Sequence, residues 1–168
     1  MKLKSENIEN QLETTRRNAL KTLRELALSH SRNRYPAMPE YARCTKSYND
    51  RTANSLTRCV IDFLNFSGWQ AERINSTGRP LDNRKVVTDI LGDMRRVGSV
   101  KWLPTSGQKG TADISATING RSVKIEVKMK DRQSENQKRY EEQVIRAGGL
   151  YWLVRSFAEF LSFYNGIV

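Results

Sequence analysis

The dipeptide Asn119-Gly120 constrains the fold more than any other part of the sequence, because it separates two runs of alternating apolar and polar residues. Asn-Gly favours the two-residue turn whose twist matches that of a β-hairpin. With these residues as the turn, 113–118 and 121–128 pair as antiparallel strands. Asp113 then lies directly opposite Glu126.

The two faces of this predicted hairpin differ in chemistry, since successive side chains of a strand point to opposite faces. One face is apolar and is expected to belong to the core: Ile114, Ala116, Ile118, Val123, Ile125 and Val127. The other face is polar throughout: Asp113, Ser115, Thr117, Ser122, Lys124, Glu126 and Lys128. We therefore expect a functional site on the polar face.

The opposed carboxylates of Asp113 and Glu126 call for a positive charge, because like charges directly opposite each other destabilise a strand pair. Lys128 supplies one cation on the same face, and a hard divalent cation satisfies carboxylate oxygens more fully. Mg²⁺ or Mn²⁺ bound here would polarise a phosphoryl oxygen and activate a water, while the lysine steadies developing charge. The alternative is an exposed salt-bridge cluster without a catalytic role.

The net charge of +11, from 29 Lys and Arg against 18 Asp and Glu, indicates a polyanionic partner such as nucleic acid. Solubility alone is the other explanation. Basic residues also flank the carboxylates along the chain: Lys109, Lys124, Lys130 and Arg132. The single histidine, His30, falls in a basic helical stretch, so we do not expect a site built on a histidine base or a histidine-ligated zinc.

Apolar spacing predicts two helices in the N-terminal part of the chain. Residues 8–29 form an amphipathic helix, for which packing on the core is the default and self-association or contact with a phosphate backbone are alternatives. Residues 32–50 contain two prolines and no sustained period, which indicates a linker or long loop. A second helix is predicted over 52–66, with Gly68 as its C-terminal cap.

The middle of the chain is less regular. A strand is predicted over 69–74. Between residues 81 and 104 the apolar positions fit a helix or a strand, except for a short strand at 98–103.

The C-terminal part is predicted to be helix, strand and helix, over 134–147, 150–154 and 157–164. The first of these helices begins with a capping-box pattern, in which the Ser134 side chain caps the helix and the Gln137 side chain bonds back to the Ser134 backbone. Gln137 is also expected to point toward the carboxylates. The chain as a whole is then an α/β sandwich around a mixed sheet, with an N-terminal helix and linker in residues 1–50 and the core in residues 51–168.

No apolar stretch reaches the roughly 20 residues that a membrane span needs, and the N-terminus lacks the apolar run of a secretory signal. A cytoplasmic protein without a membrane partner is expected. Cys44 and Cys59 lack zinc-type spacing and are expected to be reduced thiols.

Four motifs together resemble the virus-type replication-repair nuclease (VRR-NUC) branch of the PD-(D/E)XK nucleases. They are Gly110-Thr111-Ala112-Asp113, Ile125-Glu126-Val127-Lys128, Asp131-Arg132-Gln133-Ser134 with Gln137, and Ala147-Gly148-Gly149. The helix that ends at Gly68, followed by Arg73-Ile74-Asn75, also looks like the opening of stand-alone phage members. The resemblance covers roughly residues 54–160.

The resemblance implies a PD-(D/E)XK-like mixed central sheet flanked by helices, here with an extra N-terminal helix. It implies an Mg²⁺- or Mn²⁺-dependent endonuclease in which Asp113, Glu126 and the Val127 carbonyl bind the metal, Lys128 is the catalytic lysine and Gln137 supports the site. Members often carry a further glutamate early in the first core helix. That stretch has no glutamate here, and Asp50 or Glu72 are the candidates for a substitute.

Stand-alone members resemble resolvases of branched DNA and often act as homodimers. The leading hypothesis is therefore a structure-selective endonuclease for branched DNA in phage-type recombination, repair or genome processing. A less selective DNA-degrading nuclease and an inactive DNA-binding module of the same fold are the alternatives. The residues expected to contact DNA are Arg73, Asn75, Lys109, Lys124, Lys130, Arg132 and Arg139.

Overall fold

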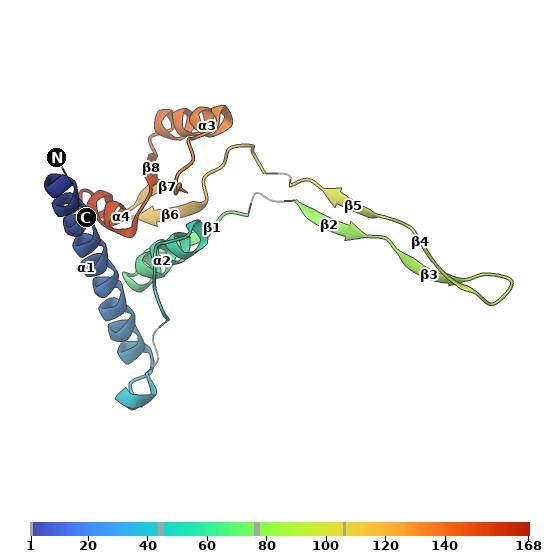
Figure 1. Cartoon of the computed structure of the whole chain (residues 1–168), viewed down its shortest axis with the longest axis horizontal. Helices are drawn as coiled ribbons and strands as arrows, with labels where there is room; N and C mark the ends of the chain where they lie inside the picture. Colours follow the sequence, from blue (N-terminus) through green and yellow to red (C-terminus); the bar gives the residue numbers. More distant parts are fainter. Residues whose placement is uncertain (1, 44–45, 76–77, 106) are drawn as a thin grey trace.

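The computed structural model describes residues 2–43, 46–75, 78–105 and 107–168 (Figure 1), so Cys44 lies outside the described residues. The helical elements, in chain order, are α1 (Lys2–Arg34), the short 3-10 turn η1 (Glu40–Ala42), α2 (Ala53–Phe66), α3 (Glu135–Arg146) and α4 (Phe157–Asn165). The strands are β1 (Gln70–Arg73), β2 (Arg79–Asp82), β3 (Lys85–Thr88), β4 (Met94–Val97), β5 (Val100–Leu103), β6 (Ile114–Ile118), β7 (Arg121–Val127) and β8 (Leu150–Val154).

The central sheet has the strand order β1-β6-β7-β8. β1, β6 and β7 pair antiparallel, while β8 runs parallel to β7 because α3 carries the chain back between them. The sheet is therefore mixed and the fold is α/β, as the sequence predicts. Within the described ranges, none of the helices combines the length and the apolar character that crossing a bilayer requires.

The β6–β7 hairpin has the predicted turn and register. Asn119 and Gly120 both have positive φ values, 48° and 73°, as the two-residue turn requires. Ile114 pairs with Ile125 and Ile118 with Arg121. The register extrapolates to Asp113 opposite Glu126, so the interpretation of the two faces holds.

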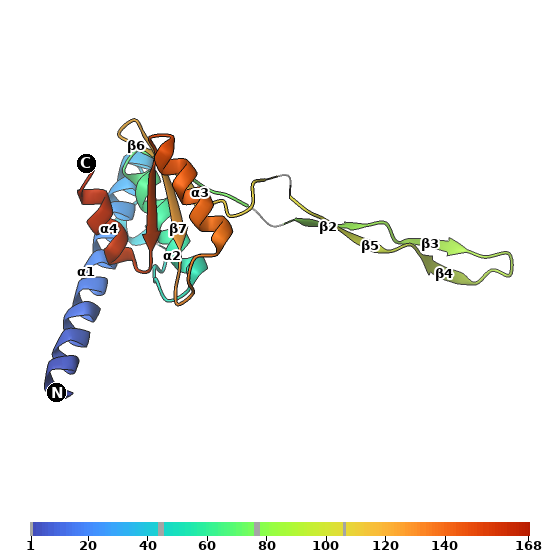
Figure 2. The same cartoon turned by 90° about the horizontal axis from the view of Figure 1, so that it is seen from above.

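The apolar face of the sheet forms the core with α2, α4 and α1. Ile114, Ile118, Val123 and Ile125 are fully buried there, together with side chains of these helices. Figures 1 and 2 show α3 on the opposite side of the sheet from α2. The contact of the Tyr140 ring of α3 with the Tyr151 ring of β8 belongs to this second layer. The polar face of the hairpin therefore lies on the α3 side.

The N-terminal helix is longer than predicted and packs on the core, which was the default expectation. It runs to Arg34 rather than to about residue 29, and it buries Ala19, Leu23 and Ala27 in the same hydrophobic cluster as α2 and α4. Leu12, which the apolar stripe included, is exposed. The following segment is more than a linker, because Tyr48 and Asp50 are buried within it.

The segment with the ambiguous pattern forms a long two-stranded arm, defined here as residues 79–103. β2 pairs with β5 and β3 with β4, both antiparallel, and every residue of these strands is exposed. The arm projects away from the rest of the molecule (Figure 2). Gly98 joins its two halves with a φ of 102°, and a Cβ there would lie 2.4 Å from the Asn83 carbonyl oxygen.

Packing of α1 on the core predicts a large effect of Leu23→Ala on stability. Leu23 is fully buried, and deletion of a buried leucine side chain costs about 2–5 kcal/mol. The free energy of unfolding, measured by chemical denaturation, should fall by that amount. Leu12→Ala is the matched control, since Leu12 is 60% exposed in the same helix, and an equal loss in both variants would contradict this packing.

Candidate active site

Asp113 lies at the end of the sheet where β6 begins. Its Oδ2 atom accepts a hydrogen bond of 3.0 Å from the Val127 amide, and its carbonyl oxygen accepts one of 2.8 Å from the Ile74 amide. These two bonds tie the residue to β7 and to the segment that follows β1. Asp113 is thus held by backbone groups on both sides.

Glu126 is a buried carboxylate, with only 2% of the residue exposed. Its Oε1 atom receives the Lys128 ammonium at 3.1 Å and a hydrogen bond from the Gln137 side-chain amide. Its Oε2 atom is buried and has no hydrogen-bond partner among the described residues. Burial, followed by the charge of Asp113, raises the pKa of Glu126, and Lys128 partly offsets this.

The backbone of Val127 presents its polar groups to Asp113. The Val127 amide bonds the Asp113 side chain, whereas the next amide, of Lys128, bonds the Val154 carbonyl of β8 at 2.9 Å. The N–H and C=O of one residue point to the same side of a strand. The Val127 carbonyl therefore lies on the Asp113 side, where the resemblance expects a metal ligand.

Gln137 performs both predicted tasks. In the capping box, its Oε1 accepts from the Ser134 amide at 2.9 Å, while the Ser134 hydroxyl accepts from the Gln137 amide. The Nε2 group is thereby left to donate to Glu126. The spacing along this helix also predicts that Tyr140, Val144 and Ala147 share the face of Gln137 and are buried against the sheet. This prediction is wrong, because α3 has no buried residue: Tyr140 and Val144 are partly buried and Ala147 is exposed.

Gly110 brings the loop before Asp113 against the first turn of α3. It has a φ of 82°, and a Cβ would lie 2.3 Å from the Asn136 carbonyl oxygen and 2.7 Å from the Gln137 amide nitrogen. Only glycine combines this φ with such a close approach. The glycine of the first motif therefore fixes the distance between the two segments that carry Asp113 and Gln137.

The basic residues predicted to contact DNA are in three kinds of position. Lys109, Lys130 and Arg132 are exposed in the loops that precede β6 and follow β7, at the carboxylate end of the sheet. Lys124 is on the polar face, where it donates to the Ser115 hydroxyl at 2.6 Å. Arg139 is exposed on α3, two residues beyond Gln137 and so turned away from Glu126.

Arg73 and Asn75, which were also predicted to contact DNA, lie in or directly after β1. Arg73 pairs with Ile114, whose side chain is on the core face, and it donates to the Asn54 side chain of α2 at 2.9 Å. Its side chain is therefore on the opposite face of the sheet from Glu126. Asn75 is exposed after β1.

Tyr151 is a neighbour of the site that sequence reasoning missed. It pairs with Lys124 in the β7–β8 ladder and so shares the polar face. Burial, and to a smaller extent the nearby Glu126 carboxylate, raise the pKa of its hydroxyl. Successive side chains of the predicted strand 150–154 point to opposite faces of the sheet, and this alternation would have placed Tyr151 on the polar face.

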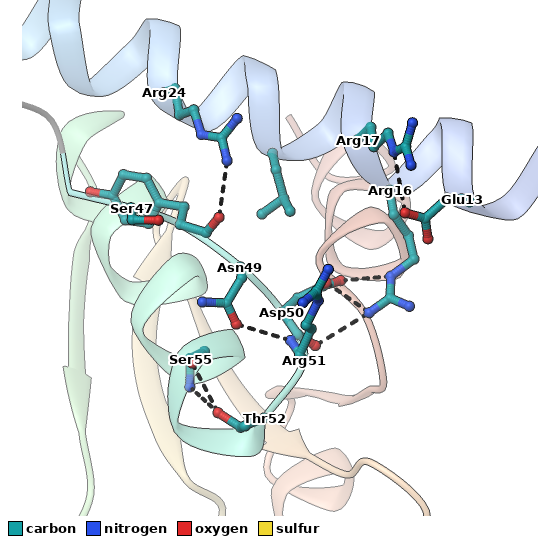
Figure 3. Close-up of a pocket in the computed structure, with 12 residues that line it drawn as sticks. Glu13, Arg16, Arg17, Arg24, Ser47, Asn49, Asp50, Arg51, Thr52 and Ser55 are labelled. Carbon is teal, nitrogen blue, oxygen red and sulfur yellow. Dashed lines mark hydrogen bonds and ion pairs between the residues drawn. The ribbon is translucent and has the colours of Figure 1, made fainter.

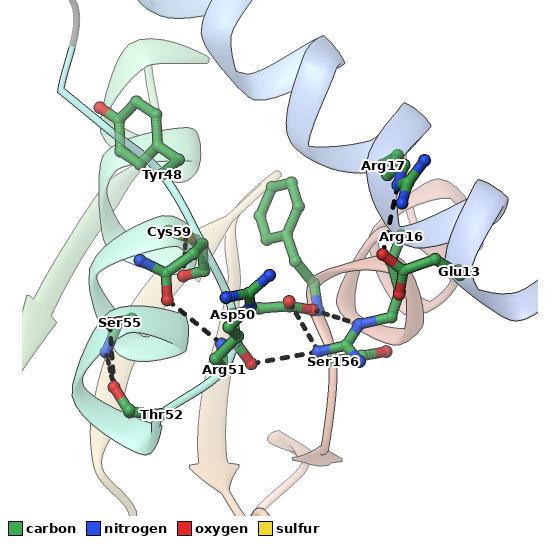
Figure 4. A network of polar contacts seen from close by, with 12 residues as sticks. Glu13, Arg16, Arg17, Tyr48, Asp50, Arg51, Thr52, Ser55, Cys59 and Ser156 are labelled. Atoms are coloured by element: carbon green, nitrogen blue, oxygen red, sulfur yellow. Dashed lines mark hydrogen bonds and ion pairs between the residues drawn. The ribbon is translucent and has the colours of Figure 1, made fainter.

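Neither candidate for a further carboxylate joins the pair. Asp50 is buried in a structural network (Figure 4), where it accepts from the Arg16 guanidinium at 2.7 Å and from the Phe157 amide at 3.1 Å. It therefore connects α1 with the start of α4. Glu72 is exposed on β1, and among the described residues no group of three Asp, Glu, His or Cys is placed to hold a metal.

A large hollow lies away from the carboxylates, between α1 and the segment before α2 (Figure 3). Its volume is about 670 Å³, and its basic lining side chains are Arg16, Arg17, Arg24 and Arg51. Arg16 bonds Asp50, Arg17 pairs with Glu13, and Arg24 donates to the Tyr48 carbonyl. Arg16 and Arg24 thus tie α1 to the segment before α2, whereas Arg17 pairs within α1. The hollow contains neither Asp113 nor Glu126.

The oxygen atoms at the end of the sheet where β6 begins and β7 ends fit a hard divalent cation. Such ions take carboxylate and carbonyl oxygens and complete their shell with waters. Glu126 Oε2 is a buried carboxylate oxygen for which the described part of the chain provides no partner, which is costly unless a cation or proton occupies it. Asp113 and the Val127 carbonyl adjoin it, so the residues present fit a metal with several water ligands.

Comparison of the sequence with protein-family models and curated proteins, and of the structure with solved structures, found no match.

The raised pKa of Glu126 predicts a pH-dependent effect of Glu126→Gln on the metal-free protein. Because the folded pKa lies above the unfolded one, the wild type loses stability as the pH rises from about 4.5 through the raised value. Gln cannot ionise, so the variant does not lose this stability. The melting temperature of the variant minus that of the wild type should therefore increase as the pH rises toward neutral. Thermal unfolding in EDTA at a series of pH values measures this difference.

Glu142→Gln is the control for this experiment, since Glu142 is an exposed glutamate of α3. It should change the melting temperature little at any pH. A Glu126→Gln difference that is constant across pH, or that reverses toward neutral pH, would contradict the assigned burial cost.

Proposed function

We propose that this protein is a metal-dependent DNA endonuclease of the PD-(D/E)XK type, belonging to the VRR-NUC branch. The observation that carries the proposal is the buried Glu126 beside Asp113. One of its carboxylate oxygens is bound by Lys128 and Gln137, and the other has no partner within residues 2–43, 46–75, 78–105 and 107–168. A buried carboxylate with a raised pKa in a polar site is typical of a functional group. The mixed sheet flanked by helices agrees with this proposal.

The side chains at the sheet edge divide the tasks of phosphodiester hydrolysis. Asp113, Glu126 and the Val127 carbonyl would hold the cation, which when bound would polarise a phosphoryl oxygen and activate a water. Gln137 keeps Glu126 oriented by its hydrogen bond. The Lys128 ammonium, 3.1 Å from Glu126, stabilises negative charge that develops on the phosphate or orients the attacking water.

DNA is the proposed substrate because the chain is strongly basic and because cations flank the site. The net charge is +11, and the exposed side chains of Lys109, Lys130 and Arg132 are in the two loops at the carboxylate end of the sheet. Cations at such positions contact the phosphate backbone and set the register of the duplex. We extend the proposal to branched DNA on the basis of the motif resemblance to stand-alone resolvase-like members.

Lys128→Ala is expected to reduce cleavage about 100-fold or more, because it removes a charge that acts on the transition state. DNA affinity should stay nearly unchanged, since one of many cations is lost. The assay compares a labelled four-way junction, a flap and a linear duplex, each with Mg²⁺, Mn²⁺ or EDTA, and measures affinity separately in EDTA.

Lys21→Ala is the matched control, because Lys21 is an exposed lysine of α1 outside the proposed site, and it should leave both cleavage and affinity near those of the wild type. Cleavage of branched substrates alone supports the structure-selective endonuclease, whereas cleavage of all three indicates a less selective nuclease. Binding without any product indicates a DNA-binding module. Normal turnover with a large loss of affinity in Lys128→Ala would contradict the assigned role.

Metal binding is tested independently of cleavage by calorimetric titration with Mn²⁺. Asp113→Asn and Glu126→Gln each remove a charged ligand and are expected to weaken binding at least tenfold, whereas Glu142→Gln should leave it unchanged. Equal Mn²⁺ affinity in all variants would remove the metal site from the proposal.

A further inference from the structure

The arm, residues 79–103, exposes apolar side chains that no described element covers. Ile90 is fully exposed, Leu91 is 81% exposed and Met94 is 80% exposed at its tip, and Trp102 is 63% exposed nearer its base. Solvent-exposed apolar groups on this scale indicate an interaction surface. The question is which partner the arm fits.

Cations lie among these apolar groups on both faces of the arm, but unevenly. One face carries Arg79, Lys85, Arg95 and Lys101, and the other carries Arg96. A basic residue lies opposite an apolar one in most of the cross-strand pairs: Arg79–Leu103, Leu81–Lys101, Lys85–Val97, Val86–Arg96 and Val87–Arg95. Neighbouring pairs of a ladder alternate between faces. Neither face of the arm is therefore purely apolar.

The acidic residues of the arm are largely engaged within it. Asp82 pairs with Arg84 at 2.6 Å, and Asp89 pairs with Arg95 at 3.0 Å while it accepts the amides of the tip turn. The remaining cations form no ion pair with any described residue: Arg79, Lys85, Arg96 and Lys101. The arm therefore presents unneutralised positive charge along its length.

This distribution favours a polyanion over a second protein chain. Burying the arm against an apolar protein surface would desolvate Arg79, Lys85 and Lys101 on one face, or Arg96 on the other, which is costly for an unpaired cation. A second copy of this chain carries the same net charge of +11 and would be repelled. Phosphates neutralise such cations, and aliphatic side chains between them can contact sugars and base edges.

The dimensions of the arm also fit a nucleic-acid groove. At about 3.3 Å per residue each side of the arm extends roughly 30 Å. A two-stranded ribbon enters the major groove of B-DNA, which is about 12 Å wide. The apolar side chains of Ile90 and Leu91 at the tip can contact the bases that are exposed in that groove.

We infer that the arm is a second DNA-binding element, which follows a groove of duplex DNA with its cations on the phosphates and places Ile90 and Leu91 against the bases. The inference rests on the proposed function in taking DNA as the partner. It adds a contact surface distant from the cleavage site. The arm then extends the footprint of the enzyme beyond the bond that is cut.

The test uses the full chain with Lys85→Gln, Arg96→Gln and Lys101→Gln combined, and a control with Arg34→Gln, Arg121→Gln and Arg146→Gln, which are exposed residues outside the arm. Both variants lose the same net charge. Affinity for a fluorescein-labelled linear duplex is measured by anisotropy in EDTA over a range of salt concentrations. The arm variant should bind about tenfold more weakly or worse, with a salt slope less steep by roughly 2–3.

A second variant, Ile90→Ser with Leu91→Ser, tests the tip without changing charge. It should weaken duplex binding several-fold and leave the salt slope unchanged, because no phosphate contact is lost. Circular dichroism checks that both arm variants keep the fold, which is expected because the exposed arm residues are not part of the core.

Two results would overturn the inference. The first is equal duplex affinity and salt slope in the arm and control charge variants. The second is a smaller mass in solution for the arm variants with unchanged duplex affinity, since the arm would then join two copies of the chain. Because binding is measured without metal, a failure of the nuclease proposal appears separately, as intact arm-dependent binding with no cleavage in Mg²⁺ or Mn²⁺.

Discussion

The register of the β6–β7 hairpin is the constraint on which the rest of the structure depends. The turn at Asn119 and Gly120 sets it, and a shift by one residue would move every apolar side chain of the hairpin to the polar face. The same register brings Asp113 next to Glu126 and holds it there through the Val127 amide. Burial of the core and assembly of the candidate site are thus two consequences of one pairing.

The burial of Glu126 conflicts with its charge, and the surrounding contacts relieve that conflict only in part. Lys128 and Gln137 satisfy one carboxylate oxygen and leave the other without a partner among the described residues. The ion pair with Lys128 does not recover the desolvation cost of that second oxygen. Under the proposed function a cation would occupy it, and the Asp113 carboxylate would then contribute to cation binding rather than to repulsion.

The parts of the molecule that surround this site have distinct mechanical roles. Asp50 joins Arg16 of α1 to the first amide of α4, so the N-terminal helix belongs to the same core as the sheet. The arm is the opposite case, since its strands pair only with each other and leave all their side chains exposed. The molecule thus combines a packed core that positions the carboxylates with an extension that reaches away from it.

The sequence by itself determined the hairpin, its two faces, the capping box of Ser134 and Gln137, and the pairing of Asp113 with Glu126. These features depend on turn chemistry and on residues close together in the chain, so alternation and spacing are enough to predict them. Only the tertiary structure decided that Glu126 is buried, that Asp50 is structural, that Arg73 faces α2 and that residues 79–103 form an arm. The burial and the partners of Glu126, Asp50 and Arg73 depend on segments that are distant in the sequence. The arm has no side that faces the core, so its sequence lacks the periodic pattern that burial imposes on other strands.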